Sequence, residues 1–377
     1  MKINHLASFS GNVGDVVNHF SFRNWFNRLI GPDIEWNEIE IRDFYRKRRF
    51  FDESFVDLVN SADLLVIGGG NFLELWPTSR TGTSIDLPIS LLDRIKVPIF
   101  WNSLGIDDGQ GIGDNAKDNF SRFLEYILSR KDFLFSVRND GSYKNLTSHF
   151  PSFANKDVPI LPDHGFFISD SLKIAKAKKD SDFLKVGINL ACDMTTIRYG
   201  SLYDSDFHKF CEELAKVLNS FPDIQLKLIP HVYSDLEIFS ELLKYLDDTL
   251  RRSNLEVVGL QPKVEGLNTI LEAYNSIDLM LAMRFHANLI PFSYCIPTFG
   301  LSNYPQISKM YDECTLGDYC IDLKNPLWTD NLKIKLLDFF QNTHSINKDF
   351  ERELIKMKDK REVFGRKIIS WIDHFVL

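Results

Sequence analysis

The stretch LMLAMRFHANLIPFSY, residues 279–294, contains the pattern that decides the fold class. An apolar run at 279–282 ends in a short polar turn, and residues 287–294 then form a candidate helix. An apolar run that is bounded by a turn and followed by an amphipathic segment is typical of a buried strand and its covering helix. The same order of elements recurs on both sides of this stretch.

Strand-like and helix-like segments alternate through the whole chain. In the first half, candidate strands lie at 3–9, 39–41, 64–67, 98–101, 133–137 and 158–161, and candidate helices at 15–29, 54–60, 84–94 and 115–129. In the second half, candidate strands lie at 185–190, 225–229, 255–258, 279–282 and 297–300, with helices between them. This βαβα order predicts an α/β protein with two doubly wound, Rossmann-like domains. We expect these domains to face a cleft, because ligands of such folds bind beyond the carboxyl ends of the strands.

A charged stretch without apolar periodicity, residues 170–182, separates the two sets of elements. We therefore predict an N-terminal domain over 1–175, which carries the two glycine-rich loops described below, and a C-terminal domain over 176–345. The remaining residues, 346–377, have a helical pattern, and we expect them to pack back across both domains.

The composition excludes several classes of protein. The 377 residues include 44 Lys and Arg against 52 Asp and Glu, and the resulting net charge of −8 disfavours a general nucleic-acid binder. A hydrophobic fraction of 44% excludes a largely disordered chain. Five cysteines without CxxC spacing indicate neither a zinc site nor a disulfide framework, and we expect no bound metal. Because we find no signal peptide and no apolar run near the ~20 residues of a membrane span, we expect a cytoplasmic protein.

A first glycine-rich loop, SGNVGD, follows the first candidate strand. Gly11, Asn12 and Gly14 lie in this loop, where glycines let the backbone approach a ligand and the next helix offers unpaired N–H groups. Asp15 ends the motif and is either a helix N-cap or a general base. The motif is not the GxGxxG fingerprint of dinucleotide-binding proteins.

A second glycine-rich loop, GGGNFL at 68–73, follows the strand at 64–67. Its residues Gly69, Gly70 and Asn71 bring the backbone close to a ligand or simply form a flexible turn from strand to helix.

Polar residues also follow two later strands of the first half. Arg138, in SVRND, follows the strand at 133–137 and offers a planar fork of donors to a carboxylate or phosphate. The alternative is an ordinary salt bridge. Asp163 and His164 follow the strand at 158–161, where they do acid–base work or only fix the turn, and His231 occupies a similar place in the second half.

The sharpest motif is AMRFHA at 282–287. Arg284 and His286 are two residues apart after a strand, so in an extended turn both side chains point to one side, beside the start of the next helix. An Arg, a His and a helix N-terminus together favour an anion site. Lys309, in YPQISK, adds a further cation after the next strand. The alternative is a buried Arg–carboxylate pair with His286 in the core.

In this order the motifs resemble those of the polysaccharide pyruvyl transferase family. The resemblance rests on GNVGD at 11–15, GGGNFL at 68–73, SVRNDGS at 136–142, AMRFHA at 282–287 and YPQISK at 304–309. It implies a fold like that of the two-domain GT-B glycosyltransferases. It also implies transfer of the pyruvyl group of phosphoenolpyruvate to a sugar of a surface polysaccharide or its lipid-linked precursor, forming a pyruvate ketal and releasing phosphate. Asn139 departs from the family pattern, which usually has Asp or Glu at that position.

The resemblance also implies the donor site. In the family, a strand-end Arg, the His of Arg-x-His and a downstream Lys are associated with phosphoenolpyruvate. The matching residues here are Arg138, His286 and Lys309, joined by Arg284. These cations would close on the donor from both domains, which suits a ligand with a phosphate and a carboxylate on three carbons.

The chemistry implied by the resemblance requires one acid and one base. The acid protonates C3 of phosphoenolpyruvate, and the base accepts protons from the sugar hydroxyls. His286 is the candidate acid or a phosphate ligand, and Asp15 or Asp163 is the candidate base. We expect no cofactor, because phosphoenolpyruvate itself is the donor.

Two other functions share parts of this pattern. A GT-B glycosyltransferase that uses a nucleotide sugar would have the same fold, with Glu272 as the candidate for the ribose diol. A carbohydrate-binding protein would have affinity for glycans without turnover. For the transferase, the expected partners are phosphoenolpyruvate and a saccharide acceptor, and no nucleic acid. A lipid-linked acceptor would bring the protein to the inner face of a membrane as a peripheral contact. The sequence predicts no particular oligomeric state.

Overall fold

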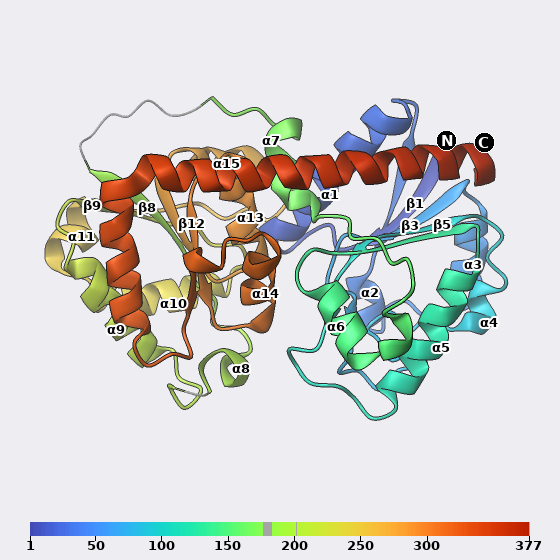
Figure 1. Ribbon diagram of the computed structural model, residues 1–377, viewed down its shortest axis with the longest axis horizontal. Coiled ribbons are helices and arrows are strands. Elements are labelled where there is room, and N and C mark those ends of the chain that lie inside the picture. The colour runs from blue at the N-terminus through green and yellow to red at the C-terminus, as the bar shows by residue number, and fades with distance from the viewer. Residues whose placement is uncertain (176–182, 201, 377) are drawn as a thin grey trace. The chain divides into compact units, whose positions relative to one another are not determined.

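The computed structural model describes residues 1–175, 183–200 and 202–376. The chain divides into two compact units. Unit 1 comprises Met1–Phe9, Asn18–His164 and Met357–Leu377, and unit 2 comprises Ser10–Val17 and Gly165–Lys356. Each unit is built on a parallel β-sheet with helices packed around it (Figure 1).

Unit 1 contains a five-stranded sheet with the order β2-β1-β3-β5-β7. Its strands are β1 (Lys2–Ala7), β2 (Glu35–Glu40), β3 (Leu64–Gly68), β5 (Ile99–Leu104) and β7 (Phe133–Val137). A small separate sheet pairs β4 (Leu73–Glu74) with β6 (Ile106–Asp107). The helices are α1 (Val13–Ile30), whose first turn belongs to unit 2, α2 (Arg42–Tyr45), α3 (Glu53–Asn60), α4 (Ile89–Leu92), α5 (Ala116–Ser129) and α6 (Ser142–His149).

The central strands of unit 1 are apolar because helices cover both faces of the sheet. Every residue of β3 and β5 is buried, as is typical of a parallel sheet that is covered on both sides. The register places Ile3 beside Leu64 and Leu65 beside Ile99, so apolar side chains lie in rows across neighbouring strands. This continuous burial fixes where the strands end and therefore where the loops that follow them begin.

Unit 2 contains a six-stranded parallel sheet with the order β10-β9-β8-β11-β12-β13. Its strands are β8 (Leu184–Asn189), β9 (Ile224–Leu228), β10 (Leu255–Val257), β11 (Leu279–Ala282), β12 (Thr298–Ser302) and β13 (Cys320–Asp322). The helices are α7 (Ile168–Ser171), α8 (Thr195–Tyr199), α9 (His208–Asn219), α10 (Asp235–Leu242), α11 (Asp248–Ser253), α12 (Leu267–Asn275), α13 (Phe285–Ser293), α14 (Pro305–Glu313) and α15 (Trp328–Phe375).

The long C-terminal helix α15 belongs to both units. Asn342 has non-helical angles, with φ −123° and ψ 21°, so α15 is two helices joined at a kink. Residues up to Lys356 belong to unit 2, and those from Met357 onward belong to unit 1. In unit 1, Phe364 and Ile368 pack in a core cluster with residues of β1 and α1. The helical segment expected at 346–377 is therefore the C-terminal part of a longer element, α15, which begins at Trp328.

The two units divide the chain differently from the ranges expected from the sequence. Residues after His164 already pack in unit 2: the Phe166 and Phe292 rings lie 5.2 Å apart, and the Ser169 hydroxyl donates to the Ser293 carbonyl at 2.6 Å. The described part of the charged stretch, residues 170–175, thus follows the division instead of forming it, and residues 176–182 lie outside the described residues. The first glycine-rich loop, at 10–17, also belongs to unit 2 although the expected N-terminal domain included it.

Two predicted elements in unit 1 are shorter in the structure. The strand expected at 158–161 makes only an isolated bridge between Ile160 and Val137. The helix expected at 84–94 contracts to α4, because the preceding residues form a hydrogen-bonded loop in which the Thr81 hydroxyl donates to the Ile85 carbonyl at 2.7 Å.

Candidate active site

The carboxyl ends of β8, β9, β11 and β12 bring the polar residues of unit 2 together. Asn189 ends β8, and its side-chain carbonyl accepts a hydrogen bond from the backbone N–H of Arg284 at 3.1 Å. Arg284 is the N-cap residue of α13, in extended backbone conformation. The apolar strand β11 is wholly buried and ends at the carboxyl edge of the sheet. Arg284 is the first charged residue after this strand, and it therefore lies at the sheet edge beside the start of α13.

Arg284 is held by two carboxylates. Its Nε donates to both oxygens of Asp235, at 3.0 and 2.9 Å, and its Nη2 also pairs with Asp235. Its Nη1 donates to Asp193 at 3.2 Å. Burial opposes the charge of Arg284, but its hydrogen bonds to Asp235 and the negative charge of that carboxylate outweigh burial and raise the pKa of the guanidinium. Arg284 therefore forms the buried arginine–carboxylate pair that the sequence offered as the alternative to an anion site. Its Nη1, however, faces the more exposed Asp193.

A second arginine, Arg198 of α8, shares Asp193 with Arg284. Arg198 Nε lies 3.2 Å from Asp193 Oδ1, and Arg198 Nη1 donates to Asn303 Oδ1 at 2.8 Å. The guanidinium also lies over the Tyr304 ring, 5.5 Å from its centre. Sequence reasoning missed Arg198, although an Asp and an Arg five residues apart directly after a strand were a usable signal.

The pKa values of Asp193 and Arg198 are both lowered, for different reasons. Burial opposes ionisation of Asp193, but Arg284 and Arg198 outweigh it and lower the pKa of that carboxyl. Burial lowers the pKa of Arg198, and repulsion from Arg284 adds to this effect against the attraction of Asp193. The arrangement is thus two neighbouring cations that share one anion, Asp193.

His286 lies in the first turn of α13, against the first glycine-rich loop. A Cβ atom at Gly14 would collide with the His286 ring, so only glycine fits at position 14. The loop is fixed in unit 2 by backbone bonds from Gly11 N–H to the Pro262 carbonyl at 3.1 Å and from Val13 N–H to the His231 carbonyl at 3.0 Å. The fold thereby brings two motifs more than 270 residues apart in sequence into contact.

The other residues of this loop have local roles that the structure defines. The Asn12 side-chain carbonyl accepts from the Gly14 N–H at 2.9 Å, and Gly11 turns the chain with a φ of 81°. Asp15 follows in the first turn of α1 and is partly exposed. Lys309 lies in α14, the helix that begins next to Tyr304, and its side chain is half-buried.

His231 contacts Asp235, the buried partner of Arg284. It is fully buried, its Nε2 lies 2.6 Å from the Tyr274 hydroxyl, and its backbone N–H donates to Asp235 at 2.9 Å. Burial, then the nearby Arg284 and His286 charges, lower its pKa well below the ordinary value, so His231 is neutral at physiological pH. Its contacts explain how Asp235, and through it Arg284, is positioned.

The polar residues that follow the strands of unit 1 form a closed network. Arg138 is 2% exposed and pairs with Asp140, at 2.7 Å from Nη2, and with Asp163, at 3.3 Å from Nη1. Asp163 is itself completely buried and also accepts from the Asn18 amide at 2.7 Å. Burial opposes the charge of Arg138, but the two acids outweigh it and raise its pKa. Asp163 is thus the anionic partner of a buried arginine.

The second glycine-rich loop lies in this same unit. Gly68 and Gly69 have φ values of 112° and 87°, and a Cβ at Gly69 would approach the Asn18 amide oxygen to 2.7 Å. The Asn71 amide donates to Asp107 at 2.9 Å. His164, in the same unit, is fully buried, and its Nε2 lies 3.0 Å from Asn102 Oδ1. Burial lowers the pKa of His164 to about 3. His164 is therefore neutral at physiological pH.

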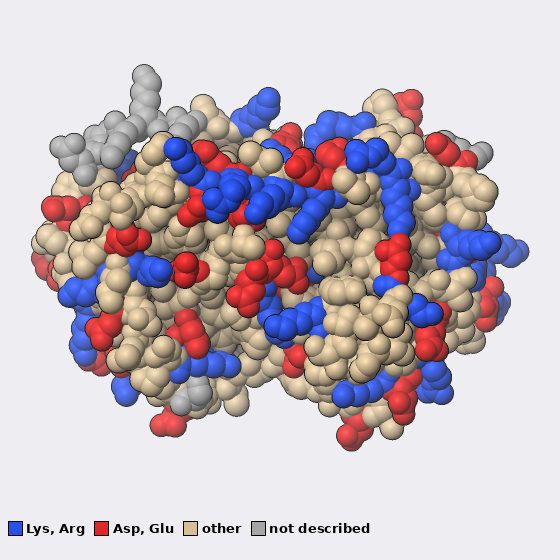
Figure 2. Space-filling model, in the orientation of Figure 1, with Lys and Arg blue, Asp and Glu red and all other residues tan. Residues whose placement is uncertain are grey.

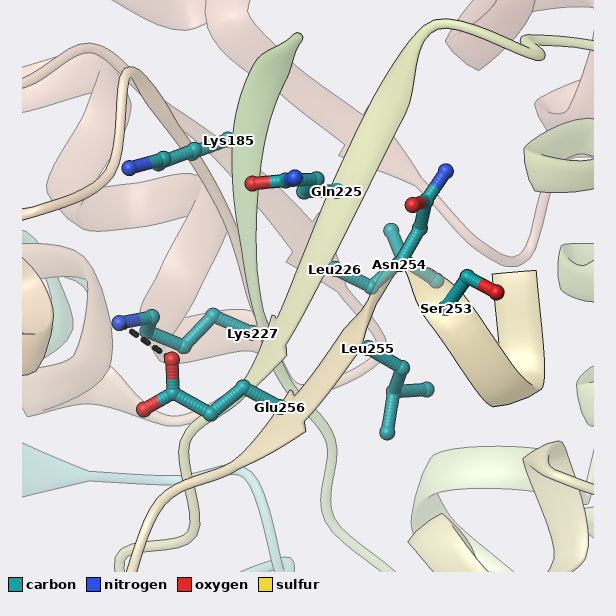
Figure 3. Close-up of a pocket in the computed structure, with 8 residues that line it drawn as sticks. All are labelled: Lys185, Gln225, Leu226, Lys227, Ser253, Asn254, Leu255 and Glu256. Carbon is teal, nitrogen blue, oxygen red and sulfur yellow. Dashed lines mark ion pairs between the residues drawn. The ribbon is translucent and has the colours of Figure 1, made fainter. Parts of the chain in front are cut away.

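A surface hollow of about 210 Å³ lies in unit 2 at the amino ends of the strands (Figure 3). It contains an ion pair between Lys227 and Glu256 at 2.8 Å. This hollow is at the sheet edge opposite Arg284 and His286. Glu272 lines a neighbouring hollow, also next to Lys227 and Glu256. Within the described residues, no cluster of three His, Cys, Asp or Glu side chains has the arrangement of a metal site.

The sequence profile of the polysaccharide pyruvyl transferase family matches residues 12–304, more than half of the chain. The chain belongs to this family. It is a transferase, and its family acts in polysaccharide pyruvyl transfer. No curated protein matches the sequence significantly. In the part of the chain that the structure describes, no helix is both long enough and apolar enough to cross a bilayer.

Solved structures of very low sequence identity share the fold of this family member. A glycosyltransferase from Rickettsia africae ESF-5 aligns with a TM-score of 0.58 and 8% identity, over 99% of this chain and 98% of that one. The complex of MnaA with UDP from S. aureus aligns with a TM-score of 0.51 and 10% identity, over 93% of this chain and 91% of that one. These similarities, with the two parallel sheets, confirm the predicted α/β class with doubly wound domains of the GT-B type.

Proposed function

We propose that this transferase moves the pyruvyl group of phosphoenolpyruvate to a sugar, forming a pyruvate ketal and releasing inorganic phosphate. The observation that carries the proposal is that Arg284 and Arg198 share the carboxylate of Asp193 at the carboxyl edge of one sheet, with His286 two residues after Arg284, in a member of this family. Two guanidiniums and an imidazole beside the start of a helix suit a small ligand with a phosphate and a carboxylate.

The proposed donor site lies in unit 2 and contains Arg284, His286 and Lys309. Arg284 is fixed by the fully buried Asp235, so its orientation toward the sheet edge does not depend on a ligand. A guanidinium that is already oriented loses little side-chain entropy when it binds an oxyanion. Arg138 belongs to unit 1, and its contribution to the donor site stays a prediction of the family resemblance.

The proposed reaction forms two C–O bonds at C2 of phosphoenolpyruvate, the first by addition and the second by substitution of the phosphate. First, an acid protonates C3 while one sugar hydroxyl bonds to C2, and a base takes the proton of that hydroxyl. Second, another hydroxyl of the same sugar bonds to C2 as the C2–O bond to phosphate breaks, and its proton leaves with inorganic phosphate. The product ketal contains the methyl group formed at C3. We assign the acid to His286, because it follows Arg284 by two residues at the start of α13 and an imidazole can donate a proton near neutral pH.

Asp15 is the better candidate for the base. It belongs to unit 2, one residue from the glycine that packs against His286, and it is partly exposed. Asp163 is completely buried and bonded to Arg138 and Asn18, so protonating it would remove the countercharge of a buried arginine. We therefore propose a structural role for Asp163.

The acceptor is proposed to be a sugar of a surface polysaccharide or its lipid-linked precursor. Lys and Arg side chains gather along α15 on the face drawn in Figure 2, interspersed with acidic residues. The exposed Lys and Arg residues of α15 include Lys348, Arg352, Lys356, Lys360, Arg366 and Lys367. Basic side chains near a bilayer attract anionic lipids, so this helix is the proposed membrane contact of a cytoplasmic enzyme whose acceptor is lipid-linked.

The decisive experiment incubates the protein with phosphoenolpyruvate and a panel of free and lipid-linked sugars. We expect release of phosphate that depends on the acceptor, together with a product heavier than the acceptor by one pyruvate less one water. Thermal-shift titration with phosphoenolpyruvate, UDP-sugars and CMP-sugars runs in parallel. Stabilisation by a nucleotide sugar without stabilisation by phosphoenolpyruvate overturns the proposal in favour of glycosyl transfer. Glycan binding without any phosphate release favours a carbohydrate-binding protein.

A further inference from the structure

One carboxylate bridges two nearly buried arginines in unit 2. Asp193 Oδ1 lies 3.2 Å from Arg198 Nε, and Asp193 Oδ2 lies 3.2 Å from Arg284 Nη1. The side chains of Arg198 and Arg284 are 7% and 10% exposed, whereas that of Asp193 is 41% exposed. The anion is therefore the solvent-facing member of the group, and each of its oxygens contacts one guanidinium.

The two arginines differ in what else neutralises them. Arg284 has a second acid, the buried Asp235, and would remain paired without Asp193. Among the described residues, Asp193 is the acid that pairs with Arg198, whose other hydrogen bond goes to the neutral Asn303 amide. A buried guanidinium with one exposed counterion readily exchanges that counterion for an anionic ligand, because the ligand restores the same charge balance.

We propose that Arg198 is a further anion-binding residue of the donor site, and that Asp193 occupies the position taken by an oxyanion group of the donor substrate. This inference rests on the proposed function, because it assigns two more residues to the same donor site. When the donor binds, its carboxylate or phosphate bridges Arg198 and Arg284, and the Asp193 side chain moves away into solvent. Asp193 is then an internal competitor of the substrate.

The geometry favours replacement of the Asp193 carboxylate by the donor over binding of the donor beside it. A free carboxylate and a phosphate can both present two oxygens to two guanidiniums, as Asp193 does. Binding without displacement would bring the anionic donor beside Asp193 at close range, and like charges there cost affinity. Asp193 lies in the loop before α8, which turns at Met194 with a φ of 52°. Because Asp193 is in neither a strand nor a helix, its side chain can move without disturbing a regular element.

The test is to remove the charge of Asp193 and measure anion binding by calorimetry. In Asp193→Asn we expect the affinity for phosphoenolpyruvate to rise by about three- to tenfold, because the competing charge is gone. In Arg198→Ala we expect it to fall by about tenfold or more. In the double variant the gain from Asp193→Asn should largely disappear, because the bridged arginine is missing. Titrations with inorganic phosphate and with pyruvate show whether the bridging group is the phosphate or the carboxylate.

A matched control exists in the same unit. Asp248 also bridges two arginines, at 3.1 Å from Arg251 and 2.8 Å from Arg252, but all three side chains are exposed on α11. Asp248→Asn should leave the affinity for phosphoenolpyruvate unchanged. Thermal unfolding checks that each variant is folded. If Asp193→Asn does not fold, Asp193→Ser and Arg198→Lys supply the same comparison.

The outcomes separate this inference from the proposed function. Wild-type turnover of phosphoenolpyruvate with unchanged or weaker affinity in folded Asp193→Asn overturns the inference alone. Tighter binding of inorganic phosphate by Asp193→Asn, in a protein that does not bind or turn over phosphoenolpyruvate, supports the anion site and overturns the proposed donor. Binding of none of these anions by either protein overturns both.

Discussion

Each unit places an arginine directly after a strand and surrounds it with two acids, but the two arrangements differ in exposure. In unit 1, Arg138 and its partners Asp140 and Asp163 are all almost completely buried. In unit 2, Arg284 has one buried acid, Asp235, and one acid, Asp193, that is 41% exposed. The first arrangement is closed, and the second leaves one side of the guanidinium facing a replaceable anion. The same local sequence signal therefore produces an enclosed ion-pair network in one unit and a partly exposed one, our candidate ligand site, in the other.

Removing each arginine should give the largest difference between the two units. Arg138→Met leaves two buried carboxylates without a countercharge, and we expect the free energy of unfolding to fall by about 3–5 kcal/mol. Arg284→Met leaves one buried acid, so we expect a smaller loss of stability together with loss of phosphoenolpyruvate turnover. Chemical denaturation and phosphate release measure the two effects.

An exposed ion pair provides the control for these arginine variants. Arg80 and Asp86 pair at 3.0 Å with both side chains exposed, so Arg80→Met should change the unfolding free energy by less than about 1 kcal/mol. Equal destabilisation by Arg138→Met and Arg80→Met would contradict the closed character of the unit 1 network.

The proposed acid in unit 2 gives the next largest effect. In His286→Ala we expect acceptor-dependent phosphate release to fall by about a hundredfold or more, because the group that protonates C3 is lost. His344→Ala, at an exposed histidine of the same unit, should retain normal rates. Near-normal turnover by folded His286→Ala would remove His286 from the mechanism.

Acidification tests the buried histidines of both units. His164 in unit 1 and His231 in unit 2 have pKa values lowered by burial, to about 3 for His164. Below the unfolded-state value of about 6.5, the unfolded chain binds protons that the folded chain does not, so stability falls with decreasing pH. For His164 this loss extends from about pH 6.5 down to about pH 3.

The expected size is at most about 1.4 kcal/mol per pH unit for each buried histidine. Chemical denaturation at intervals between pH 7.5 and 5 measures the slope. His164→Gln should flatten it, since the substituted side chain does not titrate. A variant with the wild-type slope would show that His164 takes up its proton without unfolding.

Substitutions at two glycines, one in each unit, should give the smallest difference between the units. At Gly14 an added Cβ would meet the His286 ring, and at Gly105 it would approach Arg138 Nη2 to 2.8 Å. Gly14→Ala should therefore lower kcat by about tenfold by displacing His286. Gly105→Ala should mainly lower the melting temperature by displacing the buried arginine.

A third glycine controls for the substitution itself. An added Cβ at Gly259 meets no atom within 4 Å, so Gly259→Ala should be close to wild type in both measurements. An unchanged kcat in Gly14→Ala would mean that the first glycine-rich loop does not position His286.

The sequence identified the motifs of unit 2 correctly as strand-end elements but missed three residues of the same ion-pair group. The run at 279–282 is a buried strand, and Arg284 and His286 follow it at the start of α13. Asp193, Arg198 and Asp235 were not predicted, because acids and arginines in loops are common and their pairing requires contact between segments that are distant in sequence. The complete burial of Asp163, a predicted candidate base, is likewise a feature that cannot be read from the local sequence.

The sequence alone determined the order of strands and helices and the two doubly wound domains, because alternating apolar runs and amphipathic segments have few ways to bury their apolar faces. It also placed glycines and charges at strand ends. Only the tertiary structure decided that the first glycine-rich loop packs against His286 in unit 2, and which strand-end arginine is enclosed. Those outcomes depend on backbone hydrogen bonds and on the burial of charge between distant segments, and neither leaves a periodic signal in the chain.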